Sequence, residues 1–321
     1  MSVLVFIETF QGGFKKPALE AVSYGHALSR LMQGQCQVLV YGKTDQPGLP
    51  GRHGADSVLY LDDEDGLADT AWLSGIIARE AAKFGAKALI LAQNSTSRGI
   101  LGRLAVSLKS GCASGVTSLP EIKEDRMEVS RSAFAGKASA RLSLGGPCKV
   151  LSIASNAVLM KTDGQDAPVE VLTRPEPSGK VKVLETKRIS GEIPLAEAER
   201  VVSAGRGMKE PGNWGIIEDL AHELGAATAC SRPVADSGWR PHHEHVGQTG
   251  LAIKPNLYIA IGISGAIQHL AGVNNSKVIV VINKDPEAPF FKAADYGVCG
   301  DLFEVVPRLT AAVKRYKEQH H

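Results

Sequence analysis

The stretch "LYIAIGISGAIQHLAG", from Leu257 to Gly272, decides the fold of the second half of this chain. Its first six residues form a short apolar run, which is typical of a strand buried in a sheet. The residues from Gly265 onward favour a helix. A buried strand that passes directly into a helix is the repeating unit of α/β folds, so the stretch predicts a parallel sheet covered by helices.

The start of this predicted helix carries no large side chain, because Ser264, Gly265 and Ala266 open it. The first N–H groups of a helix lack partners within the helix, and the macrodipole adds roughly half a positive charge there. Small residues leave these groups accessible, so an anion such as phosphate can bind to them. Close packing of a helix on a strand also requires small residues, and this stretch alone does not decide between the two interpretations.

The length and charge of the chain limit the classes of protein it can represent. A chain of 321 residues with 44% apolar residues predicts two globular domains with real cores. The 36 basic and 34 acidic residues nearly balance, which argues against a broad surface for nucleic acid or anionic membranes. No apolar run reaches the length of a membrane span, so a membrane-embedded protein is not expected.

The cysteines and the N-terminus indicate the compartment. The five cysteines are widely spaced and form no CxxC motif, so we expect each to be a small buried thiol in a reducing compartment. The N-terminal "MSVLVFIE" reads as a strand from the second residue, with no signal or transit segment before it. We therefore expect a cytoplasmic protein.

The first domain is expected to span residues 1–188, with its boundary near Ile189. Up to Gly111, strands such as "VLVFIE" and "ALILAQ" alternate with predicted helices at 17–32, 66–84 and 95–111. This alternation predicts a doubly wound α/β domain with a parallel sheet. From Cys112 to about Lys187 the chain consists of short strands and turns without a helix, which we interpret as an antiparallel β extension.

The second domain, residues 189–321, alternates again and predicts a parallel α/β domain. A 25-residue irregular stretch, Ser231–Pro255, interrupts it, and loops of this length in compact domains are usually functional or disordered. This stretch contains Arg232, three histidines and "GQTG", which favours a function. The predicted helices are Asn213–Leu224, one from Gly265 and Pro307–Gln319; the predicted strands are "RVVSAG", "GAATAC", "LYIAIG", "KVIVVIN" and "YGVCGDLF".

Other strand ends of this domain carry polar groups. "SAGRGM" places Arg206 between two glycines, where a guanidinium suits phosphate or carboxylate, although a surface arginine in a turn is the alternative. Ser231 and Arg232 follow another strand. "VGQTG", Val246–Gly250, offers an amide, a hydroxyl and open backbone to the edge of a flat heterocycle. Together these groups predict binding of a large, planar ligand with phosphates, although neither GxGxxG nor a Walker loop is present.

The remaining motifs are weaker. "PHHEHV" contains His242, His243, Glu244 and His245, which are residue types that bind zinc. Adjacent positions in one loop rarely converge on one ion, so we predict no metal and interpret this stretch as a solvated or gating loop. No nucleophile elbow and no Cys/His signature is present, so no catalytic residue is predicted.

The motifs of the second domain resemble the alpha subunit of electron transfer flavoprotein. "SAGRG", "SRP", "DSGW", "VGQTG", "LYIAIGISGAIQHLAG" and "VINKDPEAPFFKAADYGVCGDLFEVVP" occur in the family's order, from about Arg200 to the terminal helix. The first domain is similar in outline only. The resemblance implies an FAD-binding C-terminal domain, an N-terminal scaffold that forms the subunit interface, and a heterodimer with a beta subunit whose surface lies near the flavin.

The resemblance also implies which residues hold the FAD. The phosphates and the flavin edge would contact Arg206, Ser231 and the stretch from Ser264 to His269. The isoalloxazine would lie along the "VGQTG" loop under Arg232, with Thr249 near N5. The adenosine side would be held by Asn283, Asp301 and Leu302. The full predicted set is Arg206, Ser231, Arg232, Val246, Gly247, Gln248, Thr249, Gly250, Ser264, Gly265, Ala266, Ile267, Gln268, His269, Asn283, Asp301 and Leu302.

The sequence differs from the family pattern at two places, and the resemblance implies a role for His269. Ala204 stands where the family often has glycine, and the "PHHEH" stretch lies outside the family pattern. Electron uptake by a flavin places negative charge near N1 and the C2 carbonyl, and a donor or cation aimed there stabilises it. His269 is placed one turn into the predicted helix to be that donor.

The function implied is a one-electron carrier without substrate turnover of its own. Its donors would be flavin dehydrogenases, such as the acyl-CoA dehydrogenases of fatty acid beta-oxidation, and its acceptor a membrane quinone reductase. Two alternatives remain open. One is an NAD-dependent transferase or dehydrogenase with a domain similar to that of deoxyhypusine synthase, using Lys284; the other is a nucleotide-sensing N-terminal domain. The sequence does not name the donor, the acceptor, or the nucleotide that the beta partner holds.

Overall fold

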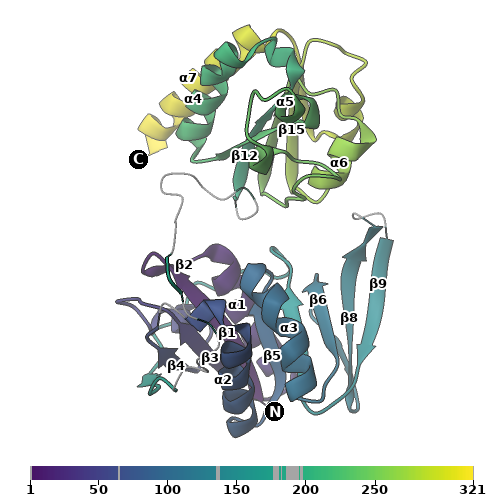
Figure 1. Ribbon diagram of the computed structural model, residues 1–321. Coiled ribbons are helices and arrows are strands. Elements are labelled where there is room, and N and C mark those ends of the chain that lie inside the picture. Colours follow the sequence, from purple (N-terminus) through teal and green to yellow (C-terminus); the bar gives the residue numbers. More distant parts are fainter. Residues whose placement is uncertain are drawn as a thin grey trace. The chain divides into compact units, whose positions relative to one another are not determined.

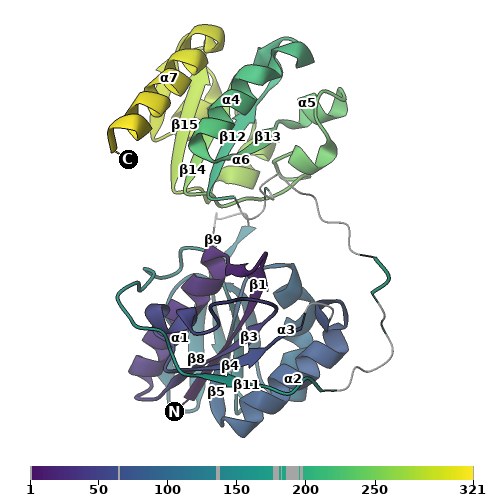
Figure 2. The same cartoon turned by 90° about the vertical axis from the view of Figure 1, so that its left-hand side faces the viewer.

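A computed structural model describes residues 2–63, 66–134, 138–175, 181, 183–185, 195 and 198–320. The chain divides into two compact units, Met1–Thr186 and Lys187–His321, and each has its own sheet (Figures 1 and 2). The boundary predicted at Ile189 lies outside the described residues. No helix in the described part of the chain has both the length and the apolar composition to cross a membrane.

The first unit is built on a mixed sheet with a parallel centre. The described strands follow one another in the order β11, β4, β3, β1, β5, β10, β6, β8 and β7, with β2 beside β1 and β9 beside β8. These strands are β1 (Ser2–Phe10), β2 (Gly13–Phe14), β3 (Cys36–Tyr41), β4 (Ser57–Leu61), β5 (Ala86–Ala92), β6 (Cys112–Val116), β7 (Glu121–Lys123), β8 (Arg126–Ala133), β9 (Ala138–Leu144), β10 (Lys149–Ile153) and β11 (Val169–Val171).

Helices cover both faces of this parallel centre, as predicted for a doubly wound domain (Figure 2). Side chains alternate between the faces of a strand, so Val3 and Val5 of β1 pack with helix α1, while Leu4 and Phe6 pack with α2 and α3. Strands buried on both faces are nearly continuous apolar runs, which explains the sequence of β1. The helices are α1 (Lys16–Leu31), α2 (Thr70–Lys83) and α3 (Ser95–Ser107), with short 3-10 turns η1 (Leu49–His53) and η2 (Gly66–Ala68).

The predicted antiparallel extension is only partly correct. Strands β7, β8 and β9 pair antiparallel, and β6 pairs antiparallel with β8 through a single pair of residues. Strand β10, however, lies parallel between β5 and β6 and belongs to the centre of the sheet. Four of its five residues, from Val150 to Ile153, are buried, and burial on both faces of the strand suits a parallel interior rather than a half-exposed antiparallel edge.

The second unit is an all-parallel sheet in the strand order β13, β12, β14, β15, β16, which confirms the predicted parallel α/β domain. Helices α4, α5 and α7 pack on one face, and α6 with the 3-10 turn η8 packs on the other. The strands are β12 (Arg200–Ala204), β13 (Ala227–Cys230), β14 (Leu257–Ile261), β15 (Val278–Asn283) and β16 (Tyr296–Cys299). The helices and turns are α4 (Gly215–Leu224), α5 (Arg232–Asp236), α6 (Ile267–Val273), α7 (Leu302–His320), η5 (Arg206–Met208), η6 (Pro211–Trp214), η7 (His242–Glu244) and η8 (Pro289–Ala293).

Several predicted boundaries in this unit are wrong. The helix expected from Gly265 begins at Ile267, because Gly265 has a left-handed φ of +83° and Ala266 has an extended ψ of 149°. The terminal helix begins at Leu302 rather than at Pro307, since the Asp301 carboxylate accepts a hydrogen bond from the N–H of Phe303 and caps it. The stretch 231–255, expected to be irregular, contains α5 and η7.

The five cysteines are all free, and Cys36, Cys148 and Cys230 are buried as expected. Cys112 is half-buried, and Cys299 is exposed on β16 at the edge of the second sheet. The expectation of burial is therefore wrong for Cys299, because an edge strand with few neighbours leaves its side chains accessible to solvent.

Candidate functional site

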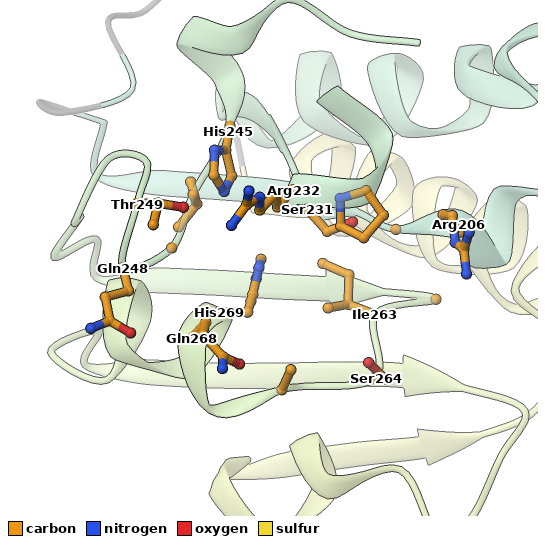
Figure 3. Close-up of a pocket in the computed structure, with 16 residues that line it drawn as sticks. Arg206, Ser231, Arg232, His245, Gln248, Thr249, Ile263, Ser264, Gln268 and His269 are labelled. Carbon is orange, nitrogen blue, oxygen red and sulfur yellow. The ribbon is translucent and has the colours of Figure 1, made fainter. Parts of the chain in front are cut away.

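A cavity of about 470 Å³ opens at the carboxyl ends of β12 and β14 in the second unit (Figure 3). The chain passes from β12 to β13 on one side and then to β14 on the other, so the order of the sheet reverses between β12 and β14. Parallel sheets bind ligands in the crevice at such a reversal. The lining residues are Gly205, Arg206, Ser231, Arg232, Pro233, His245, Val246, Gly247, Gln248, Thr249, Gly262, Ile263, Ser264, Ala266, Gln268 and His269.

Glycines bring the two strand ends into backbone contact at the floor of this cavity. The N–H of Gly207 donates to the carbonyl of Gly262 at 3.1 Å, and a Cβ on Gly207 would lie 2.7 Å from the Cα of Gly262. Gly262 itself has a left-handed φ of +59°. Close packing is therefore one reason for the small residues here. The lack of side chains at these glycines also lets a ligand approach the backbone of the strand ends.

Unpaired backbone donors lie beside the cavity. Among the described residues, the N–H groups of Ala266, Ile267 and Gln268 donate to no protein acceptor. Helix α6 has only seven residues, so its macrodipole contributes less than the sequence suggested. The unpaired N–H groups themselves are the feature that suits an anion, because they lie in an exposed first turn that a ligand can reach and have no acceptor within the helix.

Two arginines from different elements flank the cavity. The Arg206 side chain makes no ion pair with any residue that the structure describes, and it lies at the same end of the cavity as Ser264 (Figure 3). The Arg232 Nε lies 3.2 Å from the Asp236 carboxylate one helical turn away. Within the described part of the chain, Arg206 is thus an unpaired cation beside the unpaired N–H groups, whereas the charge of Arg232 is partly balanced by Asp236.

The "VGQTG" loop forms the opposite end of the cavity, where Figure 3 shows Gln248 and Thr249. The N–H of Gln248 donates to the carbonyl of Gln268 at 2.7 Å, which fixes the loop to helix α6. A Cβ on Gly272 would lie 2.6 Å from the Cα of Gly247, so the loop and the helix meet backbone to backbone. The side chains of Gln248 and Thr249 are left exposed to the cavity.

His269 lies in α6 and supplies a neutral hydrogen-bond donor. Its Nε2 lies 2.8 Å from the hydroxyl of Tyr258, which is fully buried, and its ring packs edge-on against Phe290. Burial, with a smaller contribution from His245, lowers the pKa of His269 to about 4, so the ring is uncharged near neutral pH. We assign the Tyr258 proton to Nε2, which leaves the ring N–H on Nδ1 as a donor.

The structure brings most of the predicted site residues together. Those that line the cavity are Arg206, Ser231, Arg232, Val246, Gly247, Gln248, Thr249, Ser264, Ala266, Gln268 and His269. Those that do not line it are Gly250, Gly265, Ile267, Asn283, Asp301 and Leu302. Asn283 instead donates from Nδ2 to the carbonyl of Ile263 at 3.0 Å and accepts from the N–H of Asp285, so both ends of its side-chain amide are used within the protein, as is common for a turn asparagine.

His245 was not among the predicted site residues, yet it lines the cavity together with Gly205, Pro233, Gly262 and Ile263. In the described residues no group of three His, Cys, Asp or Glu side chains is placed to hold a metal ion. The interpretation as a solvated loop is wrong for Glu244 and His245, whose side chains are buried. Glu244 accepts two hydrogen bonds from Arg240, at 2.6 and 2.9 Å, and this ion pair anchors the loop.

Comparison with known proteins gives two family models that match the chain. The model of the electron transfer flavoprotein FAD-binding domain matches residues 194–274, and that of the electron transfer flavoprotein domain matches residues 3–177. The electron transfer flavoprotein subunit alpha of Mycobacterium leprae is 35% identical over 322 residues, which cover 98% of both chains. The subunit alpha of Paracoccus denitrificans is 43% identical over 215 residues, 67% of this chain and 68% of that one.

Proposed function

Because this chain belongs to the electron transfer flavoprotein alpha-subunit family, and residues 194–274 match that family's FAD-binding domain, we propose that the cavity at the carboxyl edge of the second sheet holds the FAD. This proposal is carried by the N–H donors of Ala266, Ile267 and Gln268 beside the Arg206 guanidinium, none of which has an acceptor among the described residues. Backbone donors and a free arginine are the groups that recognise a diphosphate.

The other lining residues suit the flavin. The isoalloxazine would lie along the Val246–Gly250 loop, where the side chains of Gln248 and Thr249 are exposed to the cavity and offer polar groups. His269 would present its Nδ1–H to the bound ring, and Arg232 would lie over it. When bound, the FAD supplies one-electron chemistry, and the protein's part is to bind, orient and electrostatically bias it.

The predicted adenosine contacts lie next to this cavity rather than in its wall. Leu302 is buried, and a Cβ on Gly262 would lie 2.9 Å from its Cδ2, which places the start of α7 beside the floor of the cavity. Asn283 is the last residue of β15, and Asp301 follows β16 at the same carboxyl edge of the sheet. We propose that an extended FAD continues from the cavity along this edge, so that these residues meet its adenosine end.

The cellular role follows from the family. We propose that the chain forms a heterodimer with a beta subunit and passes electrons from flavin dehydrogenases, such as acyl-CoA dehydrogenases, to a quinone reductase. It would turn over no substrate of its own, and the first unit would act as scaffold and subunit interface. We also propose a cytoplasmic location, since all five thiols are free, as is usual in a reducing compartment.

The alternative of an NAD-dependent transferase or dehydrogenase is not favoured. The family model that matches the second unit describes an FAD-binding domain, and Lys284 does not line the cavity. The nucleotide-sensing role for the first unit stays a prediction, which titration of the protein with ATP or AMP would test.

Co-expression with a beta subunit tests the proposed function. We expect the purified heterodimer to show the absorption bands of an oxidised flavin, and we expect heat to release FAD that chromatography identifies. A heterodimer that remains colourless after incubation with excess FAD would refute the proposal, and release of NAD in place of FAD would revive the alternative.

A further inference from the structure

His245 is a buried polar side chain that has no partner among the residues that the structure describes. Its side chain lines the cavity, and the residue is only 8% exposed. No described residue forms a hydrogen bond or an ion pair with its ring nitrogens. Buried polar groups are almost always hydrogen-bonded, so an unpartnered imidazole inside a cavity points to a ligand as its missing partner.

The position of this imidazole is fixed by its own loop. The backbone of His245 extends the sheet beside Cys230, and its carbonyl accepts a hydrogen bond from the N–H of Leu251 at 2.9 Å. A Cβ on Gly250 would lie 2.8 Å from the ring's Cγ and Nδ1, and one on Gly247 would lie 3.4 Å from Nε2. The two glycines of the "VGQTG" loop therefore make room for the ring, which lies inside the loop we assign to the isoalloxazine.

The anchored segment before it keeps the ring in the cavity. Glu244 is paired with Arg240, whose Nη1 also donates to Glu218 of helix α4 at 2.9 Å and whose guanidinium lies 5.6 Å from the Trp214 ring. This cluster ties η7 to helix α4. His245 is thus held by backbone and side-chain contacts on both sides and does not depend on the ligand for its placement.

Charged and titratable groups from three elements face His245. Helix α5 presents Arg232 and Asp236, which are paired with each other at 3.2 Å; η7 presents His242, and α6 presents His269. Burial is the largest cause that lowers the pKa of His245, and Asp236 opposes it. Cys230 stays a neutral thiol because burial raises its pKa to about 12. The imidazole is therefore neutral near pH 7, and added negative charge beside it would favour its protonated form.

We propose that His245 contacts the bound flavin and takes up a proton from solvent when an electron reaches that flavin. The inference rests on the proposed function, since it requires FAD in this cavity. The electron comes from a reduced flavin dehydrogenase, and the proton binds a ring nitrogen of His245, which becomes an imidazolium. The two charges stay on separate groups and neutralise each other, so the reduction is linked to pH.

Reduction of the flavin and protonation of His245 favour each other. His245 has a lower pKa when the flavin is oxidised and a higher pKa when negative charge lies beside it. Between these two values, reduction takes up a proton, and the equilibrium constant for one-electron reduction falls as pH rises. For one proton per electron the limit is a tenfold change per pH unit, or about 59 mV.

The test is the one-electron midpoint potential of the FAD-loaded heterodimer, measured from pH 5 to 9 by spectroelectrochemistry. His245→Gln keeps a polar side chain of similar size but cannot titrate in this range. His222→Gln is the matched control, because that side chain is 89% exposed on helix α4 and does not line the cavity. We expect the wild type and His222→Gln to share a pH-dependent segment that approaches tenfold per pH unit, and His245→Gln to lose it.

Equal pH dependence in His245→Gln and the wild type would overturn the inference. A second readout uses NMR of the histidine rings in a His269→Gln heterodimer, which lacks the other imidazole that lines the cavity. It should show one imidazole whose shifts change on addition of FAD and whose pKa rises on reduction. If every imidazole keeps its pKa on reduction, the inference is overturned even where His245→Gln does not fold. Failure of the wild type to bind FAD would instead overturn the proposed function.

Discussion

Replacing Arg206 by alanine should weaken FAD binding without weakening the fold. The side chain is exposed and makes no ion pair with the described residues, so its removal should change the free energy of unfolding by no more than about 0.5 kcal/mol. A hydrogen bond to a charged group contributes about 1.5–3 kcal/mol. At about 1.4 kcal/mol per tenfold, the FAD dissociation constant should rise roughly 10- to 150-fold.

The assay is a fluorescence titration of the flavin-depleted heterodimer with FAD, together with chemical denaturation of each variant. Arg308→Ala is the matched control, since it removes an exposed arginine from helix α7 that does not line the cavity. Arg206→Lys keeps the charge but not the bidentate geometry and should fall between the wild type and Arg206→Ala. A dissociation constant for Arg206→Ala within twofold of the control would refute the assignment of Arg206 to the diphosphate.

Three further variants test the surroundings of the cavity. Gly262→Ala adds a Cβ at a left-handed φ of +59°, so it should lower the free energy of unfolding by at least about 1–2 kcal/mol. Gly215→Ala is the control: a Cβ on Gly215 would have no neighbouring atom within 4 Å, so that variant should be neutral or stabilising. Glu244→Gln leaves Arg240 without its buried counter-ion and should cost about 3 kcal/mol in denaturation; a cost below about 0.5 would show that the pair does not anchor the loop. Since burial lowers the pKa of His269 to about 4, its protonation opposes folding, and the flavin-free heterodimer should lose up to about 3 kcal/mol as pH falls from about 6.5 to 4. His269→Gln should flatten that loss in denaturation curves taken across the same pH range, and an unchanged slope would argue against the buried neutral ring.

The parts of the fold that local patterns determine were predictable. The apolar runs of β12, β14 and β15 and the small residues that follow them identified a parallel sheet and the edge at which ligands bind. Strand β10 could not be placed in the same way, because its parallel partners β5 and β6 lie far away in the sequence. Local sequence indicates that a strand exists, whereas its neighbours depend on the whole sheet.

The predicted helix boundaries were wrong where tertiary contacts override the local helix propensity. Gly265 is held at a left-handed φ where a Cβ would lie 2.6 Å from the Cα of Phe290, and this contact comes from a segment more than twenty residues away. The start of α7 could have been predicted from the sequence. Asp301 is a good capping residue, but Pro307 was given too much weight as a helix start.

The candidate site shows the same division. Arg206, Ser231 and the "VGQTG" loop were identified because each directly follows a strand or carries a motif, and the sheet brings them to one cavity. His245 was missed because adjacent histidines were judged only as metal ligands. The signal that could have found it is its position directly before that loop, since a residue next to a ligand-binding turn tends to share its cavity.

The most direct test of the central claim is a crystal structure of the FAD-bound heterodimer. We expect the FAD diphosphate within hydrogen-bonding distance of the Arg206 guanidinium and of the N–H groups of Ala266 to Gln268, with the isoalloxazine against the Val246–Gly250 loop. An FAD that leaves these N–H groups without an acceptor, or that lies away from the carboxyl ends of β12 and β14, would contradict the account.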